Sequence, residues 1–184
     1  EEQADKLRTL LFKEDGAINP MYVGMTAKTL AAKIDANAEE NTKILLVEGK
    51  GLGRENRLCK EKLCPVLQYF IYDDFEQALD GAKINLLMEG AGHTATVFTN
   101  SRETAELVGA SLPVGRVCVN QSGANASGGS LMNGFAPTMS LGCGSWGNNS
   151  ISENLTYKHL MNKTVVAYLK PGFTPPTADE IWAL

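Results

Sequence analysis

Apolar and polar positions follow one another along most of the chain in patterns that predict helices and strands in turn. Apolar residues recur at intervals of three and four in four segments, which predicts amphipathic helices over residues 2–14, 27–34, 73–88 and 102–112. Short apolar runs predict four strands, over residues 43–48, 63–72, 94–99 and 116–120. Because strand and helix alternate between residues 43 and 120, we expect an α/β fold with a mostly parallel sheet flanked by helices.

Individual residues mark where several of these elements begin or end. Gly16 is placed to stop the first helix, and Thr26 can cap the second. Asp73, with Glu76 three residues later, predicts a capping box for the third helix. Pro65 is expected at the start of its strand, because proline cannot donate a hydrogen bond within a sheet.

The periodicity disappears over residues 121–150, which are rich in Gly, Ser, Asn and Ala. A loop of this length inside a compact domain is uncommon and is usually functional or disordered. Its larger apolar residues, Phe135, Leu141 and Trp146, favour an ordered and functional loop.

The segment after this loop predicts one more helix and one more strand. Ser152 or Asn154 can cap a helix that runs to about Leu160. Residues 164–169 predict the last strand, and the prolines that follow indicate an extended tail.

Composition places the chain among ordinary soluble globular proteins. Its 184 residues suffice for one or two domains, with 43% hydrophobic and 21% charged residues. No stretch approaches the ~20 apolar residues of a membrane-spanning helix. The net charge of −4 argues against nucleic acid as the main partner. We therefore expect neither a membrane nor a nucleic acid as partner.

The cysteines and histidines do not form a metal-binding pattern. No two cysteines make a CxxC pair, and His93 and His159 are far apart in sequence, so we expect no metal site. Few cysteines and no export signal predict a reduced, cytoplasmic protein.

A glycine-rich motif stands out at residues 141–154, which read LGCGSWGNNSISEN. It resembles a signature near the C-terminus of the CoA-acylating aldehyde dehydrogenases, which include acetaldehyde, succinate-semialdehyde and sulfoacetaldehyde dehydrogenases. Three further stretches agree in the same order: residues 61–65 (EKLCP), 90–95 (GAGHTA) and 117–120 (VCVN). The resemblance covers essentially the whole chain, and residues 179–182 (DEIW) are most similar to the succinate-semialdehyde type.

The resemblance implies a reaction in which a cysteine thiolate attacks the aldehyde. NAD or NADP takes the hydride, and CoA then removes the acyl group from the cysteine as acyl-CoA. The partners implied are a small aldehyde and CoA, and the leading candidates for the aldehyde are succinate semialdehyde and acetaldehyde. Such chemistry needs a thiol of low pKa and oriented N–H donors for the developing oxyanion.

The chain departs from the family pattern in one respect. It lacks the Asn-Gly-x-x-Cys motif that carries the nucleophile and the nucleotide-binding domain with its glycine-rich turn. It also begins with Glu1 rather than Met. We therefore expect a C-terminal fragment: residues 1–162 form the catalytic α/β domain without the nucleophile, and residues 163–184 an oligomerisation-type strand and tail. The catalytic cysteine is expected upstream of Glu1, the isolated chain is expected to be inactive, and the full enzyme is expected to be a homo-oligomer.

Three residues have roles that the resemblance suggests or excludes. Glu61 matches the glutamate that accepts hydrogen bonds from the nicotinamide ribose; the alternative is a solvated charge between two lysines. His93 is a candidate proton shuttle for the CoA thiol, against a hydrogen-bonded structural histidine. Cys143 lies between glycines but is not at the family's nucleophile position, so close backbone packing is the expected role.

The resemblance also places the loop over residues 121–141 along the acyl tunnel, with a merely exposed loop as the alternative. The candidates for the substrate or CoA pocket are His93, Asn120, Ser122, Asn125, Ser127, Thr138 and Leu141. Lys158 and Lys163 are expected to be solvated, with anchoring of CoA phosphates as the alternative.

Two other functions remain open from the sequence. One is a water-using aldehyde dehydrogenase, although the motif at residues 142–147 is typical of the acylating group. The other is a non-catalytic α/β module for ligand binding or assembly, which the missing nucleophile favours for the chain alone. The sequence also leaves open NAD against NADP, and whether the enzyme lies free in the cytoplasm or within a bacterial protein compartment.

Overall fold

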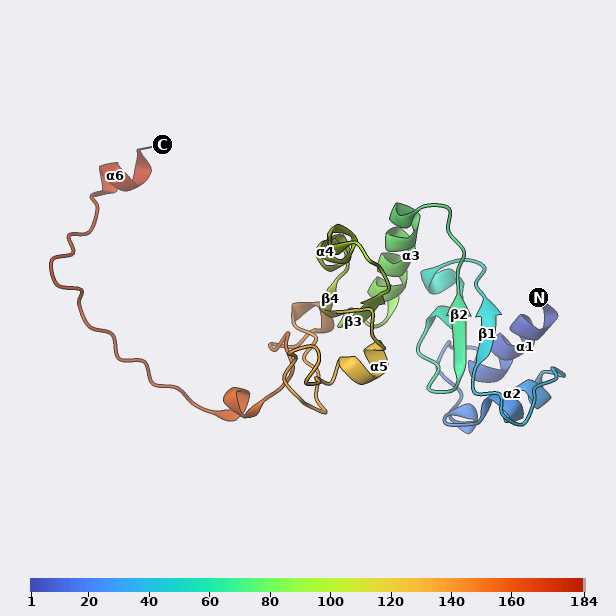
Figure 1. The fold of residues 1–184 in the computed structure, drawn as a ribbon. Helices are drawn as coiled ribbons and strands as arrows, with labels where there is room; N and C mark the ends of the chain where they lie inside the picture. The colour runs from blue at the N-terminus through green and yellow to red at the C-terminus, as the bar shows by residue number, and fades with distance from the viewer. Residues whose placement is uncertain (184) are drawn as a thin grey trace.

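The computed structural model describes residues 1–183 and shows two parallel two-stranded sheets. The helices and strands are, in chain order, α1 (Glu2–Leu11), α2 (Ala27–Lys33), β1 (Leu45–Glu48), β2 (Val66–Tyr69), α3 (Phe75–Met88), β3 (Gly92–Val97), α4 (Arg102–Ser111), β4 (Val114–Val119), α5 (Gly123–Ala126) and α6 (Ala178–Trp182). Short 3-10 helices add η1 (Pro20–Tyr22), η2 (Gly53–Glu55), η3 (Arg57–Cys59), η4 (Ser145–Gly147) and η5 (Tyr157–Leu160). Figure 1 shows the two sheets in separate parts of the molecule, with α3 between them.

The first unit consists of α1, α2 and the β1–β2 pair. Leu45 pairs with Val66 and Glu48 with Tyr69, so the two strands are parallel and in simple register. A continuous apolar core joins the helices to the sheet, formed by Leu7, Leu11, Phe12, Leu30, Ile34, Val47, Leu58 and Val66. The first unit is thus held by side-chain packing of the usual kind.

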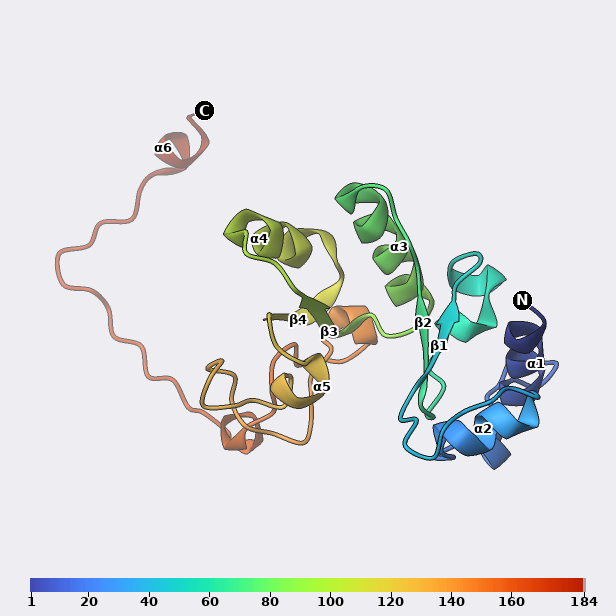
Figure 2. The same cartoon turned by 45° about the vertical axis from the view of Figure 1, so that its right-hand side comes forward.

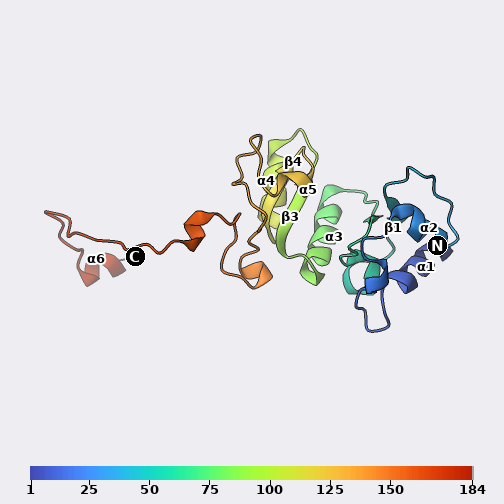
Figure 3. The ribbon, with the colours of Figure 1, turned by 90° about the horizontal axis from the view of Figure 1, so that it is seen from below.

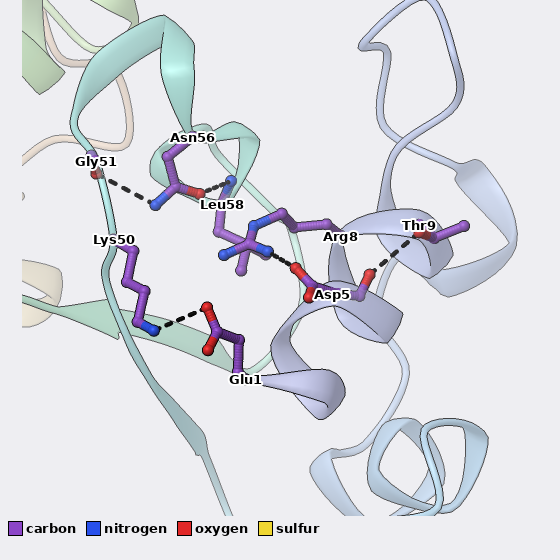
Figure 4. Close-up of polar contacts among 8 residues, drawn as sticks. All are labelled: Glu1, Asp5, Arg8, Thr9, Lys50, Gly51, Asn56 and Leu58. Carbon is purple, nitrogen blue, oxygen red and sulfur yellow. Dashed lines mark hydrogen bonds and ion pairs between the residues drawn. The ribbon is translucent and has the colours of Figure 1, made fainter.

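A buried amide organises the loop that follows β1. Asn56 is 1% exposed. Its side chain accepts from the Leu58 amide (3.1 Å) and donates to the Gly51 carbonyl (3.3 Å). Nearby, the Lys50 ammonium lies 2.8 Å from the Glu1 carboxylate and ties the N-terminus to this loop (Figure 4). Since an unsatisfied buried amide is costly, these bonds fix the loop conformation.

The second unit consists of α3, α4, α5 and the β3–β4 pair. Figures 1 and 2 show α3 and α4 on one side of the pair, and α5 with the glycine-rich loop on the other. The helix side is apolar, with Val108, Leu112 and Val114 buried among partly buried residues of α3 and both strands. The opposite side is therefore the one that faces the loop over residues 121–150.

Helix N-termini are capped by side chains close to where the sequence indicates. Thr26 accepts from the Thr29 amide, which confirms its predicted role. For α3, however, the cap is Asp74, which accepts from the Gln77 amide, so the prediction of Asp73 with Glu76 was wrong by one residue. The Gln77 side chain accepts from the amide of Asp73, the residue before the cap, and not from that of Asp74.

The first helix ends earlier than predicted. Phe12 is extended and forms a bridge with Ile18, so α1 stops at Leu11 rather than near residue 14. Gly16 has a φ of 82° and lies in the turn between them. Burial of Phe12 in the first core accounts for the early end, because the extended backbone turns this ring inward.

Two further predictions need correction. The strands form two separate pairs instead of one continuous sheet, although both pairs are parallel as expected. The predicted helix from residue 152 to 160 is only the 3-10 turn η5, because Asn154 is buried and its side chain bonds to other loops instead of capping.

The C-terminal segment runs away from the rest of the molecule (Figure 3). Residues 164–169 were predicted to form a strand, yet they have no strand partner among residues 1–183 and are exposed throughout. A strand needs a hydrogen-bonded neighbour, so an extended segment alone does not complete one. The tail ends in α6, and its last residue, 184, lies outside the described part.

Within the described residues, no helix has the length and apolar character that crossing a membrane requires.

Candidate functional site

The face of the β3–β4 pair turned away from α3 and α4 carries polar side chains; we call it the loop face, formed by Thr94, Thr96, Arg116 and Cys118. Thr94 pairs with Arg116 and Thr96 with Cys118 in the strand register, so these side chains are direct neighbours. Side chains alternate along a strand, which is why Ala95 and Val117 join the apolar helix side instead. The loop face supports the glycine-rich segments that carry most candidate residues.

Arg116 is a buried hub on this face, with only 4% of its surface exposed. Its Nη2 donates to the carbonyls of Gly92 (3.2 Å), His93 (3.1 Å) and Gly142 (2.8 Å). Its Nε donates to Thr94 Oγ1 (3.3 Å), and its Nη1 donates to Asn154 Oδ1 (3.3 Å). One side chain therefore joins the start of β3 to both ends of the glycine-rich motif, at Gly142 and Asn154.

Asn154 extends this connection to the preceding loop. It is 6% exposed, and its amide nitrogen donates to the carbonyls of Ser127 (2.9 Å) and Ala136 (2.8 Å). We call the side chains of Arg116 and Asn154, with the oxygens they bind, the Arg116–Asn154 network. The single bond of this network that spans the most sequence, from Arg116 to Asn154, joins residues 38 positions apart.

Glycines allow the backbone segments around this network to touch. A Cβ added to Gly92, whose φ is 84°, would lie 2.0 Å from the carbonyl oxygen of Cys143. One added to Gly142 would lie 2.2 Å from the carbonyl oxygen of Ile151. Larger residues therefore do not fit at either place, and Cys143 packs directly on the start of β3.

Cys143 itself is partly buried, and its amide donates to the Asn149 side chain (2.8 Å). The other three cysteines lie elsewhere, and burial raises the pKa of each thiol, those of Cys59, Cys64 and Cys118. A raised pKa disfavours the thiolate that a nucleophile requires. These three thiols are therefore poor nucleophile candidates.

His93 occupies the second position of β3, directly after Gly92, which contacts Cys143. Its amide donates to the Gly90 carbonyl (3.1 Å) and its carbonyl accepts from Arg116. The imidazole is exposed and has no hydrogen-bond partner among residues 1–183. The structure thus holds the backbone of His93 at both sides and leaves its ring accessible.

Glu61 is joined to the segment that leads into the start of β3. Its amide donates to the carboxylate of Glu89, which lies just after α3 and four positions before His93. Lys62 turns toward the carbonyls of Leu58 (2.6 Å) and Lys60 (2.9 Å), and burial lowers the pKa of its ammonium. The Glu61 carboxylate is exposed and has no hydrogen-bond partner within the described residues, so it is open to a ligand.

The remaining pocket candidates have different surroundings. Asn120 has a φ of 53°, and its amide group is engaged at both ends by the Thr99 backbone, at 2.9 and 2.8 Å. Thr138 is partly buried and its amide bonds to the Gly128 carbonyl (2.8 Å). Leu141 is partly buried and forms a bridge with Asn154. Ser122 begins α5 and is exposed.

Asn125 and Ser127 follow within the same turn. Asn125 is exposed. Ser127 is 6% exposed, and its carbonyl accepts from Asn154.

A cavity of about 930 Å³ borders Arg116. Its lining includes Arg116, Phe135, Asn154, His159 and the two lysines considered above, Lys158 and Lys163. His159 Nδ1 accepts from the Thr156 amide (2.9 Å), so its Nε2 carries the proton and donates to Glu153 (3.0 Å). None of His93, Asn120, Ser122, Thr138 and Leu141 lines this cavity.

In the part of the chain that the structure describes, no three His, Cys, Asp or Glu side chains are placed to hold a metal ion.

Comparison with known proteins identifies the family. No family model matches the chain. The chain is 46% identical over 182 residues to the succinate-semialdehyde dehydrogenase (acetylating) of Clostridium kluyveri, and 39% identical over 168 residues to a sulfoacetaldehyde dehydrogenase of an Acholeplasma species. These matches cover 99% and 90% of the chain. The chain belongs to the CoA-acylating aldehyde dehydrogenases.

Solved structures support the same family and fold. The acetylating aldehyde dehydrogenase of Geobacillus thermoglucosidasius matches 96% of the chain with a TM-score of 0.85 and 29% identity. A probable aldehyde dehydrogenase of Listeria monocytogenes matches 90% with a TM-score of 0.81. The predicted α/β fold and the predicted family are confirmed.

The match is to part of each relative. The chain spans 40% of the length of the C. kluyveri enzyme and 34% of the Acholeplasma enzyme. It covers 38% of the Geobacillus enzyme's chain in the solved structure.

Sequence reasoning missed the Arg116–Asn154 network of this family member. One signal was available, because an arginine inside a run of valines and cysteine at residues 114–119 needs buried partners. No sequence signal identified those partners, which are mostly backbone carbonyls and the side chain of Asn154, a residue predicted to cap a helix.

Proposed function

We propose that the chain forms part of an NAD(P)-dependent enzyme that converts a small aldehyde and CoA to acyl-CoA. In the overall reaction the aldehyde carbon is oxidised, NAD(P) is reduced to NAD(P)H, and the thiol proton of CoA is released. Succinate semialdehyde and acetaldehyde are the proposed substrates. The observation that carries the proposal is the 46% identity to the acetylating succinate-semialdehyde dehydrogenase along 99% of the chain.

Glu61 is the proposed contact of this chain with the cofactor. A carboxylate offers only acceptors, which suits the two hydroxyls of a ribose. The Glu61 carboxylate fits this role because it is exposed and unpaired within residues 1–183, while both neighbouring lysines bind backbone carbonyls. The nicotinamide ring would supply the hydride acceptor, and Glu61 would orient it by holding the ribose.

His93 is proposed to take the proton from the CoA thiol. An imidazole suits this step because its pKa lies near neutrality. Its exposed ring and doubly held backbone fit a group that meets a ligand better than a histidine that fills a core.

The loop of residues 121–141 is proposed to line the acyl pocket. Ser122, Asn125 and Thr138 would provide its polar contacts, with Leu141 as an apolar wall. Asn120 would shape the pocket through its backbone, because its amide is already engaged by Thr99. The nucleophilic cysteine is proposed to come from the part of the enzyme outside the matched region.

The exposed segment over residues 164–169 is proposed to pair with a second copy in a homo-oligomer. Its apolar side chains include Val165 and Leu169, at 85% and 90% exposure. An extended apolar segment of this kind needs a partner or protection. A cytoplasmic location is proposed for the enzyme.

A chimera tests the proposed function. These 184 residues replace the matching region of the C. kluyveri enzyme, and NAD(P)H formation from succinate semialdehyde and from acetaldehyde is measured with and without CoA. We expect activity that depends on CoA, and none from the 184-residue chain alone. A folded chimera that is inactive with both aldehydes, or equally active without CoA, would reject the proposal.

A further inference from the structure

Arg116 carries a buried positive charge that no carboxylate neutralises within residues 1–183. All of its hydrogen-bond partners are neutral oxygens, from the Thr94 hydroxyl, the Asn154 amide and backbone carbonyls. Removing a guanidinium from water is costly, and replacing a buried ionic group by an apolar one of similar volume is often neutral or stabilising. Packing alone therefore does not explain an arginine at this position.

The geometry of its bonds suggests what the arginine does. A guanidinium presents its donors in a rigid planar fork, so that partners bound to different nitrogens have fixed relative positions. Here Nε and Nη1 bind Thr94 Oγ1 and Asn154 Oδ1, both at 3.3 Å. The third nitrogen, Nη2, is thereby directed at the carbonyls of Gly92, His93 and Gly142, at 3.2, 3.1 and 2.8 Å. The first residues of β3 and the glycine-rich motif are thereby held in one orientation.

The residue between these contacts is His93. Gly92 before it touches the Cys143 carbonyl, and the His93 carbonyl itself is bound by Arg116. Its ring is exposed and has no hydrogen-bond partner among residues 1–183, so the backbone alone fixes the point from which the side chain extends. A change in the contacts of Arg116 would therefore move this point.

We propose that Arg116 is a positioning residue, which fixes the start of β3, and with it the backbone that carries the His93 imidazole, against the Gly142–Cys143 turn. The proposal rests on the proposed function in that His93 receives the CoA proton. Arg116 itself touches no substrate and acts through His93.

The first test uses the 184-residue chain and requires no activity. Arg116→Lys keeps the charge but replaces the planar fork by a single nitrogen. Hydrogen exchange is followed at the amides of Gly142 and Gly144, which bond to the Glu153 and Ile151 carbonyls at 3.0 and 2.8 Å. We expect exchange at both to become about tenfold faster or more, because the turn loses its anchor. Unchanged exchange would overturn the proposal.

Two controls separate this local effect from unfolding. Arg102→Lys changes an exposed arginine of α4 and should leave both amides unchanged. The amide of Leu45, bonded to Pro65 in the first unit, should keep its exchange rate in every variant. If Arg116→Lys fails to fold, Thr94→Val removes one acceptor from the network and should accelerate the same two amides to a smaller extent.

The second test is a double-mutant cycle in the chimera, with Arg116→Lys and His93→Gln. If Arg116 acts through His93, Arg116→Lys should lower kcat/KM for CoA by about 10- to 100-fold with His93 present and by less than about threefold without it. An equal loss in both backgrounds would overturn the positioning role. If His93→Gln alone changes nothing, the proposed role of His93 fails, while amide exchange still decides whether Arg116 holds the turn.

Discussion

Each of the two α/β units of the chain is stabilised internally by a different kind of interaction. The first unit buries a continuous set of large apolar side chains from two helices and both strands. The apolar cluster of the second has three buried members, Val108, Leu112 and Val114, and this unit relies on the Arg116–Asn154 network on its loop face. Most candidate site residues lie in the second unit, which indicates that apolar packing provides the scaffold and directional polar bonds place the functional groups.

The largest expected effect concerns the apolar core of the first unit. Leu30→Ala removes a side chain that is 0% exposed and should lower the free energy of unfolding by about 2–5 kcal/mol. Urea denaturation measures the loss. Leu131→Ala, at a fully exposed leucine, is the matched control and should change stability by less than about 0.5 kcal/mol. Similar losses for both variants would show that the first unit does not depend on this core.

A second prediction concerns close backbone contact in the second unit. Gly92→Ala combines a left-handed φ with a clash against Cys143, and should destabilise by about 2–4 kcal/mol. Gly134 has a φ of 73° but nothing near its Cβ position, so Gly134→Ala should cost about 1 kcal/mol. Thermal unfolding of both variants compares them, and equal shifts would mean that the contact with Cys143 is not tight.

The two buried asparagines, one in each unit, allow the sharpest contrast. Asn154→Ala leaves the carbonyls of Ser127 and Ala136 without their donor, and Asn56→Ala does the same to Gly51. Each should lower stability by about 1–3 kcal/mol in denaturant unfolding. Only Asn154→Ala should also speed exchange of the Gly142 amide. Faster exchange of the Gly142 amide in both variants would mean that a change in the first unit also loosens the glycine-rich motif.

The smallest effect is expected from pH. Burial raises the pKa of Cys59, Cys64 and Cys118, so the folded state keeps these thiols protonated where the unfolded chain would release the protons. Their contribution to stability is therefore complete below the ordinary thiol pKa and is lost as pH rises through the raised values. Unfolding followed from pH 7 to about 10 should show a gradual decline. Cys118→Ala should reduce the slope of the unfolding free energy against pH. An unchanged slope would contradict a contribution from the Cys118 thiol.

Local sequence signals were sufficient for most helices and strands. Thr26 capped its helix as predicted, and the strands of the second unit were found within about two residues, the usual uncertainty of element boundaries. The predicted strand over residues 164–169 did not form, because strand formation depends on a partner that the sequence of one chain does not show. The single expected sheet became two pairs for the same reason, since pairing between strands is not a local property.

The candidate site was predictable only through resemblance. Glu61 and His93 were selected by the motifs around them, and nothing local indicates that Glu89 links their segments. Arg116 lies in a predicted strand and Asn154 in a segment predicted to be helical, and their side chains meet across 38 positions. Such contacts depend on the tertiary fold and appear only in the structure.

The most direct test of this account is the catalytic effect of the two buried asparagines. Asn56→Ala and Asn154→Ala are introduced separately into the chimera, and kcat/KM for CoA is measured at a temperature where both variants are folded. If the Arg116–Asn154 network places the reactive groups, Asn154→Ala should lower kcat/KM by about tenfold or more, while Asn56→Ala should change it by less than about twofold. Equal losses in the two variants, or no loss with Asn154→Ala, would contradict the assignment of the site to the second unit.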